Sequence, residues 1–225
     1  MKEEETTIRP YLSTYEDSNT TVLLPSAYLA PIQHYAHLAS RPNAMMECYD
    51  SYTKQTYRNR CIIAGPMGPM PLTIPVVKPE SGKQLMRDIR ISDHGNWRHL
   101  HWNALKSAYN RSPFFEYYAD DFAPFYERRW DFLFDFNCDL QRLVCSLLDI
   151  ETTFTPTTSY DIHPACADMR PLVDPRTSTP DASGVCLRPY YQVFKAQNGF
   201  LPNLSIVDLL FNMGPEGILY LKPER

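Results

Sequence analysis

Short apolar runs and one helical stripe alternate in the first fifty residues, and their order limits the folds open to the chain. Residues 21–24 form a β-type run that stops at Pro25. Residues 31–39 follow with apolar side chains at helical spacing, and Pro31 occupies the first turn, a position that suits proline. Residues 45–49 form a second buried β-type run. The pattern predicts a strand, a helix and a second strand.

Further strand-like runs follow before the helices. Residues 61–64 and 72–77 flank the connection GPMGPMP, which predicts an antiparallel pair. Residues 84–92 alternate between apolar and polar side chains, which predicts another strand. Residues 152–158 are β-branched and strand-like.

The remaining elements have helical periodicity. An amphipathic helix is expected from Trp97, with Asn96 as its N-cap and a break before Pro113. Residues 122–148 predict a longer helix, whose apolar stripe comprises Leu133, Phe136, Leu140, Val144 and Leu147. A last helix is marked by a capping box of Ser205 and Asp208 and by Gly214 beyond its end. We therefore predict one α/β (or α+β) domain, with a mixed β-sheet covered by helices.

The domain is expected to span residues 21–225, after a polar N-terminal arm of residues 1–20. Residues 159–189 contain five prolines and almost no periodicity. A long irregular segment of this kind is typical of a lid, a binding loop or local disorder.

Composition excludes several classes of protein. A net charge of −4 argues against nucleic acid as the main ligand. No apolar run is long enough to cross a membrane, and the acidic start MKEEETT lacks the apolar core of a secretory signal. The six cysteines contain no C-x-x-C pair, so we expect reduced, structural thiols. These features predict a cytoplasmic location.

His101 is the first candidate catalytic residue. It shares an apolar helical stripe with Trp97, one turn earlier, and lies next to Trp102. An ordinary imidazole pKa of about 6.5 suits a general base near neutral pH. The alternative is a core histidine that hydrogen-bonds to a main-chain carbonyl. A zinc site of His94, His99 and His101 has no standard spacing, so no metal site is predicted.

The run KQTYRNR, residues 54–60, is the candidate anion-binding segment. It contains Lys54, Arg58, Asn59 and Arg60. An arginine fork or a lysine point charge can grip a phosphate or carboxylate. The alternative is a solvated polar loop between strands.

Four further side chains are candidates. Tyr28 and His34 follow the first strand, where open α/β sheets usually bind ligands, although they can equally be packing residues of a helix start. Asp50 ends the second strand run and can orient Lys54 or a substrate hydroxyl, or simply form a turn. Asn212 lies on the apolar final helix, one turn after Asp208. The acidic pair at residues 120–121 fits the start of a helix better than a metal site.

Known cofactor and nucleophile motifs are absent from the sequence. It contains no G-x-G-x-x-G, no phosphate-binding glycine loop with lysine, no G-x-S-x-G and no Cys/His knuckle. No cofactor is therefore assigned.

Five segments together resemble the WbqC-like protein family. They are LPSAYLAPIQHYAHL, Asp50 with KQTYRNR, LTIPV, WRHLHWNALKSAYNRSPFF and LPNLSIVDLLFNMGPEG, in the family's order. Many members begin with His-Gln before P-x-Y-L-P, whereas here Leu24 and Pro25 precede Tyr28. If that histidine is catalytic in the family, this chain either lacks the chemistry or uses His34 as its catalytic residue. The segment before the last helix, often glycine-rich in the family, is shortened and proline-rich here, and the match is closest to the subgroup with a compact C-terminal half.

The resemblance implies a bacterial protein linked with O-antigen, lipopolysaccharide or other surface-glycan gene clusters. It suggests a transferase of a glycosyl, acyl or aminoacyl group acting on an activated sugar or glycan precursor. The partner would be a small-molecule or nucleotide-linked substrate, with Lys54, Arg58 or Arg60 on the anionic donor and His101 as the base. A non-catalytic ligand-binding or scaffold protein of a cell-envelope glycan pathway is the alternative. Tyr28, Asp50, Asn59, Trp97 and Asn212 complete the predicted substrate site.

Overall fold

A four-stranded parallel sheet forms one half of the molecule. The computed structural model describes residues 21–78, 82–176 and 188–222. The strand order is β5-β2-β1-β6, and each neighbouring pair is parallel. The strands are β1 (Val22–Pro25), β2 (Asn43–Glu47), β5 (Thr153–Pro156) and β6 (Ala167–Asp168). The predicted α/β class is therefore confirmed.

The helix α1 (Ile32–Ala39) connects β1 to β2 as predicted. Pro31 precedes it in an extended conformation, and its fixed φ suits the entry to a helix. α1 packs beside α4 (Leu133–Leu147) on one face of the sheet, where Gln141 of α4 contacts both His34 and Met46. Because side chains alternate along a strand, the odd-numbered residues of β1 and β2 face the other side.

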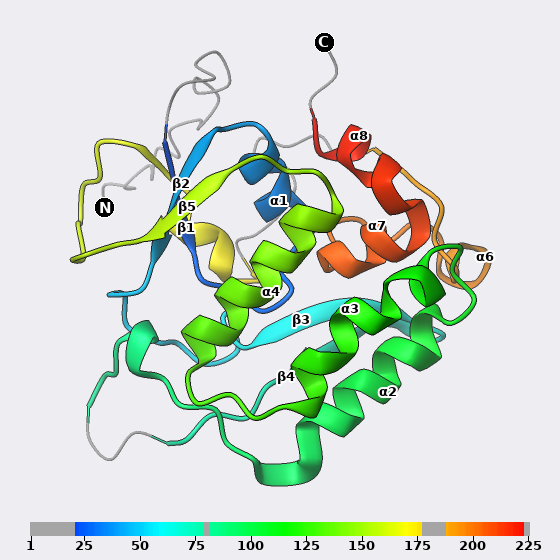
Figure 1. Cartoon of the computed structure of the whole chain (residues 1–225), viewed down its shortest axis with the longest axis horizontal. Helices are drawn as coiled ribbons and strands as arrows, with labels where there is room; N and C mark the ends of the chain where they lie inside the picture. The colour runs from blue at the N-terminus through cyan, green and yellow to red at the C-terminus, as the bar shows by residue number, and fades with distance from the viewer. Residues whose placement is uncertain (1–20, 79–81, 177–187, 223–225) are drawn as a thin grey trace, which may run out of the picture.

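A separate antiparallel hairpin lies beside the sheet (Figure 1). It consists of β3 (Arg60–Gly65) and β4 (Gly68–Thr73), so the predicted antiparallel pairing is confirmed. The second strand differs from the predicted 72–77: it begins at Gly68, inside the predicted connection, because the turn uses only Pro66 and Met67. Main-chain bonds fix the hairpin against the helices: the N–H of Ala64 donates to the Tyr109 hydroxyl, and the N–H of Ser205 donates to the carbonyl of Ile62. The predicted mixed sheet is thus a parallel sheet and a distinct two-stranded one.

The helices pack around this hairpin and meet in an aromatic core. They are α2 (Trp97–Tyr109), α3 (Phe115–Glu127), α4 and α7 (Ile206–Met213), with the shorter α6 (Lys195–Asn198) and α8 (Ile218–Leu221) near the carboxyl end. The 3₁₀ turns are η1 (Met86–Asp88), η2 (His94–Asn96), η3 (Arg170–Val173) and η4 (Gly214–Gly217). The largest fully buried rings include Tyr28, Tyr35, Tyr109, Phe122, Phe136 and Phe211. None of the described helices is long and apolar enough to span a membrane.

Two sequence-based elements were wrong. The helix predicted over 122–148 is α3 and α4, because the backbone is extended at Arg128 and at Phe132. The segment predicted as a strand over 84–92 contains the turn η1 and three isolated bridges, from Leu85 to Ser51, from Arg90 to Phe132 and from Ile91 to Val76. Met86, Ile89 and Ile91 are buried, which accounts for the apolar pattern, but the bridges form no continuous ladder.

The predicted helix caps also differ from the structure. Asn96 adopts a left-handed conformation with φ of 47° and makes no side-chain cap. The Ser205 hydroxyl donates to the carbonyl of Leu29, so it does not cap α7. The Asp208 carboxylate is buried and accepts bonds from Tyr109, Tyr190 and Gln192. Tertiary partners thus replace the predicted capping box.

The proline-rich segment contributes to the sheet. Residues 159–176 include β6, which pairs with β1, and η3 directly after it. This part is therefore a structural element as well as a connection. Residues 177–187 and the predicted arm of residues 1–20 lie outside the described residues.

Gly214 ends α7 with a left-handed φ of 56°. A Cβ atom at this position would lie 2.6 Å from two ring atoms of Phe114. We therefore predict that Gly214→Ala lowers the free energy of unfolding by about 2 kcal/mol or more, through a steric clash in addition to backbone strain. Urea denaturation measures this change.

Gly95→Ala is the matched control. Its φ of 74° is also left-handed, but a Cβ there has no neighbour within 4 Å. Gly95→Ala should lower the free energy of unfolding only through backbone strain, by about 1 kcal/mol. Equal losses for the two variants would contradict the steric argument.

Candidate functional site

The carboxyl ends of the parallel strands bring polar residues together. Glu47 ends β2 and is fully buried. Its Oε1 accepts hydrogen bonds from the Tyr49 N–H at 2.8 Å and from the Thr157 hydroxyl at 2.9 Å. Its Oε2 accepts from Nη1 of Arg170 at 3.1 Å. One carboxylate therefore links the segments that follow β2, β5 and β6.

Arg170 follows β6 and binds two carboxylates. Its Nε and Nη2 donate to the two oxygens of Asp168, at 2.9 and 2.7 Å, in a bidentate pair. These bonds raise the pKa of the guanidinium above its ordinary value, which keeps it charged. The ring of Tyr160 lies 4.7 Å from the guanidinium carbon. Arg170 is therefore held in one position, in which it can still contact a ligand.

A second buried ion pair joins Arg58 to Asp50. The loop that carries them is fixed by Asn137 of α4, whose amide donates to the Arg58 carbonyl at 2.8 Å. Burial raises the pKa of Asp50, and the neighbouring Arg58 charge opposes that rise. Among the described residues, Oδ1 of Asp50 and Nε of Arg58 have no hydrogen-bond partner. Such unpaired buried atoms are costly unless a ligand or water satisfies them.

Both ion pairs border one pocket of about 410 Å³, which we call the carboxyl-edge pocket. It is lined by Tyr49, Asp50, Ser51, Arg58, Tyr160 and Arg170. Strand order reverses at β1, which has β2 on one side and β6 on the other. Open α/β sheets bind ligands at such a switch point, outside the carboxyl ends of the strands. The lining offers two guanidinium groups for an anion, and a carboxylate, a serine and two tyrosines for hydroxyl groups.

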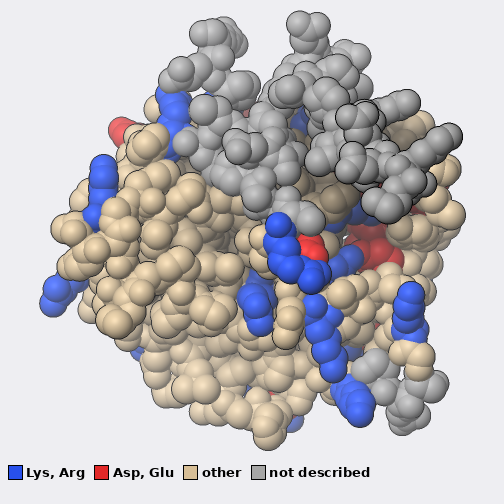
Figure 2. Space-filling view, turned by 180° about the vertical axis from the view of Figure 1, so that it is seen from behind, with Lys and Arg blue, Asp and Glu red and all other residues tan. Residues whose placement is uncertain are grey.

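Acidic side chains accompany the basic ones on this protein. Figure 2 shows Lys and Arg side chains lying directly beside Asp and Glu on the face seen from behind. Within the part of the chain that the structure describes, no group of three or more His, Cys, Asp or Glu residues is placed to hold a metal ion. At the carboxyl-edge pocket the paired charges are Arg58 with Asp50, and Arg170 with Glu47 and Asp168.

His101 lies in the interior and not in the lining of this pocket. Its Nδ1 is 3.0 Å from the Tyr28 hydroxyl, which is 2.8 Å from the Tyr126 hydroxyl, and the edge of Trp97 packs on the ring. Burial lowers the imidazole pKa to about 4, and a hydrogen bond to the main chain of Thr73 only partly opposes this. The ring is therefore neutral at pH 7, and the Tyr28 hydroxyl donates to it when the other ring nitrogen donates to Thr73.

His34 is also buried and neutral. Its Nε2 is 3.0 Å from Oε1 of Gln141, and burial lowers the imidazole pKa to about 4. This contact joins α1 to α4. Neither of the two histidines has a position from which it can exchange a proton with a ligand in the carboxyl-edge pocket.

Three residues of the predicted anion-binding segment, Lys54, Asn59 and Arg60, do not line the carboxyl-edge pocket. Lys54 is exposed in a turn. The Asn59 amide donates to the carbonyl of Ile74 at 2.8 Å, and Nε of Arg60 donates to the Thr73 hydroxyl at 3.2 Å. These two residues tie the start of β3 to the end of β4.

Trp97 and Asn212 are likewise separate from the pocket lining. Trp97 packs its edge on Phe136 as well as on His101. The amide of Asn212 donates to the Asp208 carbonyl one turn earlier in α7. Of the ten candidate residues, the structure brings Asp50 and Arg58 into the carboxyl-edge pocket.

Sequence reasoning missed Glu47, Tyr160 and Arg170. Arg170 lies in the proline-rich segment, where no periodicity announces β6. The available signal was local: an arginine two residues after Asp168, directly before an apolar Pro-Leu-Val run.

The two buried histidines predict a loss of stability in acid. Their folded-state pKa values of about 4 lie below the ordinary 6.5, so between these pH values the unfolded chain binds more protons. Stability should therefore fall as pH falls from 6.5 towards 4, by about 2 kcal/mol per histidine at about pH 5. Urea denaturation at neutral pH and at about pH 5 measures this loss.

His34→Gln should lower stability at neutral pH and make it less dependent on pH. The exposed His99→Gln is the control, and it should keep the slope of the parent. A parent protein whose stability is flat between pH 7 and pH 5 would contradict the burial of neutral rings.

Comparison with known proteins places the chain among bacterial relatives. Residues 27–171 match the model of the WbqC-like protein family. An uncharacterized protein of Mycobacterium tuberculosis (strain ATCC 25618 / H37Rv), Rv1507c, is 30% identical over 194 residues, which cover 76% of this chain and 84% of that protein. No solved structure matches. The matched residues begin just after β1 and extend through β6, and the sequence resemblance is confirmed: the chain belongs to the WbqC-like protein family.

Proposed function

We propose that this protein binds an activated sugar or glycan precursor in the carboxyl-edge pocket and transfers a glycosyl, acyl or aminoacyl group in bacterial surface polysaccharide biosynthesis. The observation that carries the proposal is the pair Arg58 and Arg170. They come from loops after two different strands, yet they line one pocket with Asp50. The surface-glycan setting comes from the resemblance to the family, so it rests on analogy.

The charges of the pocket suit an anionic ligand that also carries hydroxyl groups. Arg58 and Arg170 would hold a phosphate or carboxylate through charge-assisted bonds. Both guanidinium groups already pair with carboxylates, so the ligand would share them and need not displace them. Tyr49 and Tyr160 would bind sugar hydroxyls or pack on a sugar ring.

Asp50 is the proton acceptor that we propose for transfer. Burial raises its pKa, so it is a stronger base than an ordinary carboxylate, and its Oδ1 has no partner among the described residues. This assignment replaces the general base expected at His101. That imidazole is already engaged by Tyr28 and is 5% exposed.

Binding without turnover is the second candidate function. The burial of His34 and His101 favours it, because the two groups most suited to proton transfer at neutral pH have no ligand access. A scaffold or ligand-binding protein of a cell-envelope glycan pathway needs only the two arginines.

Arg170→Lys tests the binding site. Lysine keeps the charge but loses the planar fork, so we expect the dissociation constant for UDP-glucose to rise at least tenfold, which corresponds to about 1.4 kcal/mol. Isothermal titration calorimetry measures it, with a thermal melt to confirm folding. Arg129→Lys, at a side chain 82% exposed, is the control and should bind as the parent does. A parent protein with no affinity for UDP-glucose or UDP-N-acetylglucosamine would count against the proposal.

Asp50→Asn separates transfer from binding. If Asp50 is the base, the variant should still bind UDP-glucose while its consumption, followed by mass spectrometry with a panel of sugar and amine acceptors, falls at least a hundredfold. Recovery of all the bound UDP-glucose intact from the parent protein would support the scaffold function instead.

A further inference from the structure

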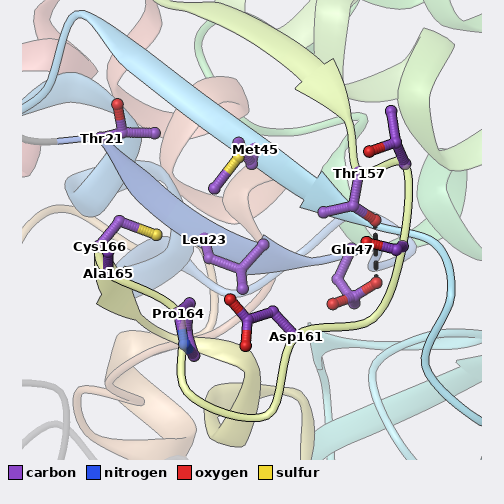
Figure 3. A pocket seen from close by; sticks show the side chains of 11 residues that line it. Thr21, Leu23, Met45, Glu47, Thr157, Asp161, Pro164, Ala165 and Cys166 are labelled. Atoms are coloured by element: carbon purple, nitrogen blue, oxygen red, sulfur yellow. Dashed lines mark hydrogen bonds between the residues drawn. The ribbon is translucent and has the colours of Figure 1, made fainter.

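A second hollow lies on the face of the sheet that α1 and α4 do not cover. We call it the sheet-face pocket, and its volume is about 610 Å³. Odd-numbered residues of the strands, Leu23, Met45 and Glu47, form one wall, and the segment of residues 157–166 forms the other (Figure 3). The parallel sheet thus has helices on one face and this pocket on the other.

The chemistry of this pocket differs from that of its neighbour. Its lining carries two carboxylates, of Glu47 and Asp161, and four hydroxyl groups, of Thr21, Thr157, Thr158 and Ser159, above an apolar floor. Among the described residues, no lysine or arginine lines it. A second anion is therefore disfavoured, and a neutral or positively charged polar ligand is favoured.

Asp161 supplies the negative charge at the mouth of this pocket. Figure 3 shows its carboxylate pointing into the hollow, between Leu23 and Pro164. Its Oδ1 accepts a hydrogen bond from the N–H of His163 at 2.9 Å. No basic side chain pairs with it among the described residues, so its charge is available to a ligand.

The two pockets share a wall. Glu47 lines the sheet-face pocket and Arg170 lines the carboxyl-edge pocket, and these two side chains are bonded to each other at 3.1 Å. Consecutive residues of one loop divide in the same way: Tyr160 belongs to the carboxyl-edge pocket and Asp161 to the sheet-face pocket. Ligands in the two pockets would therefore lie on either side of one ion pair.

We infer that the sheet-face pocket is a second binding compartment, which takes a neutral or amino-bearing sugar. Leu23 and Met45 provide an apolar surface for a sugar ring, and the threonine and serine hydroxyls provide partners for its hydroxyl groups. Asp161 would bind an ammonium group through a charge-assisted bond.

The test compares two sugars that differ in charge. Glucosamine carries an ammonium group at neutral pH, and N-acetylglucosamine does not. Asp161→Asn should raise the dissociation constant of glucosamine at least fivefold and leave that of N-acetylglucosamine within twofold. Thr158→Trp, which fills the pocket from its outer wall, should raise the dissociation constants of both sugars at least tenfold. Ligand-observed NMR titration measures these constants, and Asp121→Asn on the exposed face of α3 is the control.

The inference and the proposed function can be tested independently. Unchanged binding of both sugars to Asp161→Asn and Thr158→Trp, or no binding of either sugar to the parent protein, would overturn the inference. UDP-glucose is measured on the same variants, and its affinity should stay within twofold of the parent. If Arg170→Lys loses UDP-glucose binding while Asp161→Asn and Thr158→Trp bind both sugars as the parent does, the inference fails and the proposed function stands. If Asp161→Asn and Thr158→Trp lose sugar binding as expected but the parent protein does not bind UDP-glucose, the proposed function fails and the inference stands.

Discussion

The architecture of the site depends on one buried ion pair, between Glu47 at the end of β2 and Arg170 after β6. A fully buried carboxylate is costly to desolvate, so it persists only where charge and hydrogen bonds compensate it. Here Arg170, Thr157 and the Tyr49 N–H supply that compensation from three directions. The pair thus ties the segments after three strands together, and it forms the partition between the carboxyl-edge and sheet-face pockets.

His34 and His101 connect elements of the fold in the interior. His34 joins α1 to α4, and His101 joins α2 to Tyr28, in the segment between β1 and α1. Each ring is neutral because burial penalises its charged form, and a neutral ring can both donate and accept within a dry interior. Neither histidine therefore belongs to the lining of the carboxyl-edge pocket, and the buried ion pairs of Arg58 and Arg170 lie after the strand ends.

Much of the fold follows from local patterns. The run from β1 through α1 to β2 and the end of α7 at Gly214 lie where the sequence predicts them, and the hairpin β3–β4 has the predicted pairing, with β4 starting four residues earlier than predicted. Those elements have a regular apolar period or a turn residue with a fixed conformation. Errors occurred where a period was interrupted without a strong breaker, as between α3 and α4, or where isolated bridges imitated a strand, as around Ile91.

The sequence by itself determined the α/β class through the order of its local patterns and the family through five segments taken together, and it indicated two of the pocket residues, Asp50 and Arg58. Only the tertiary structure decided that Arg170 meets Glu47, 123 positions away, and that Tyr28 is the partner of His101. Arg170 reaches Glu47 because β6 lies beside β1, and this neighbour is set by packing summed over the whole core, which no local spacing records. A side chain's neighbours, and with them its charge state, are properties of that packing.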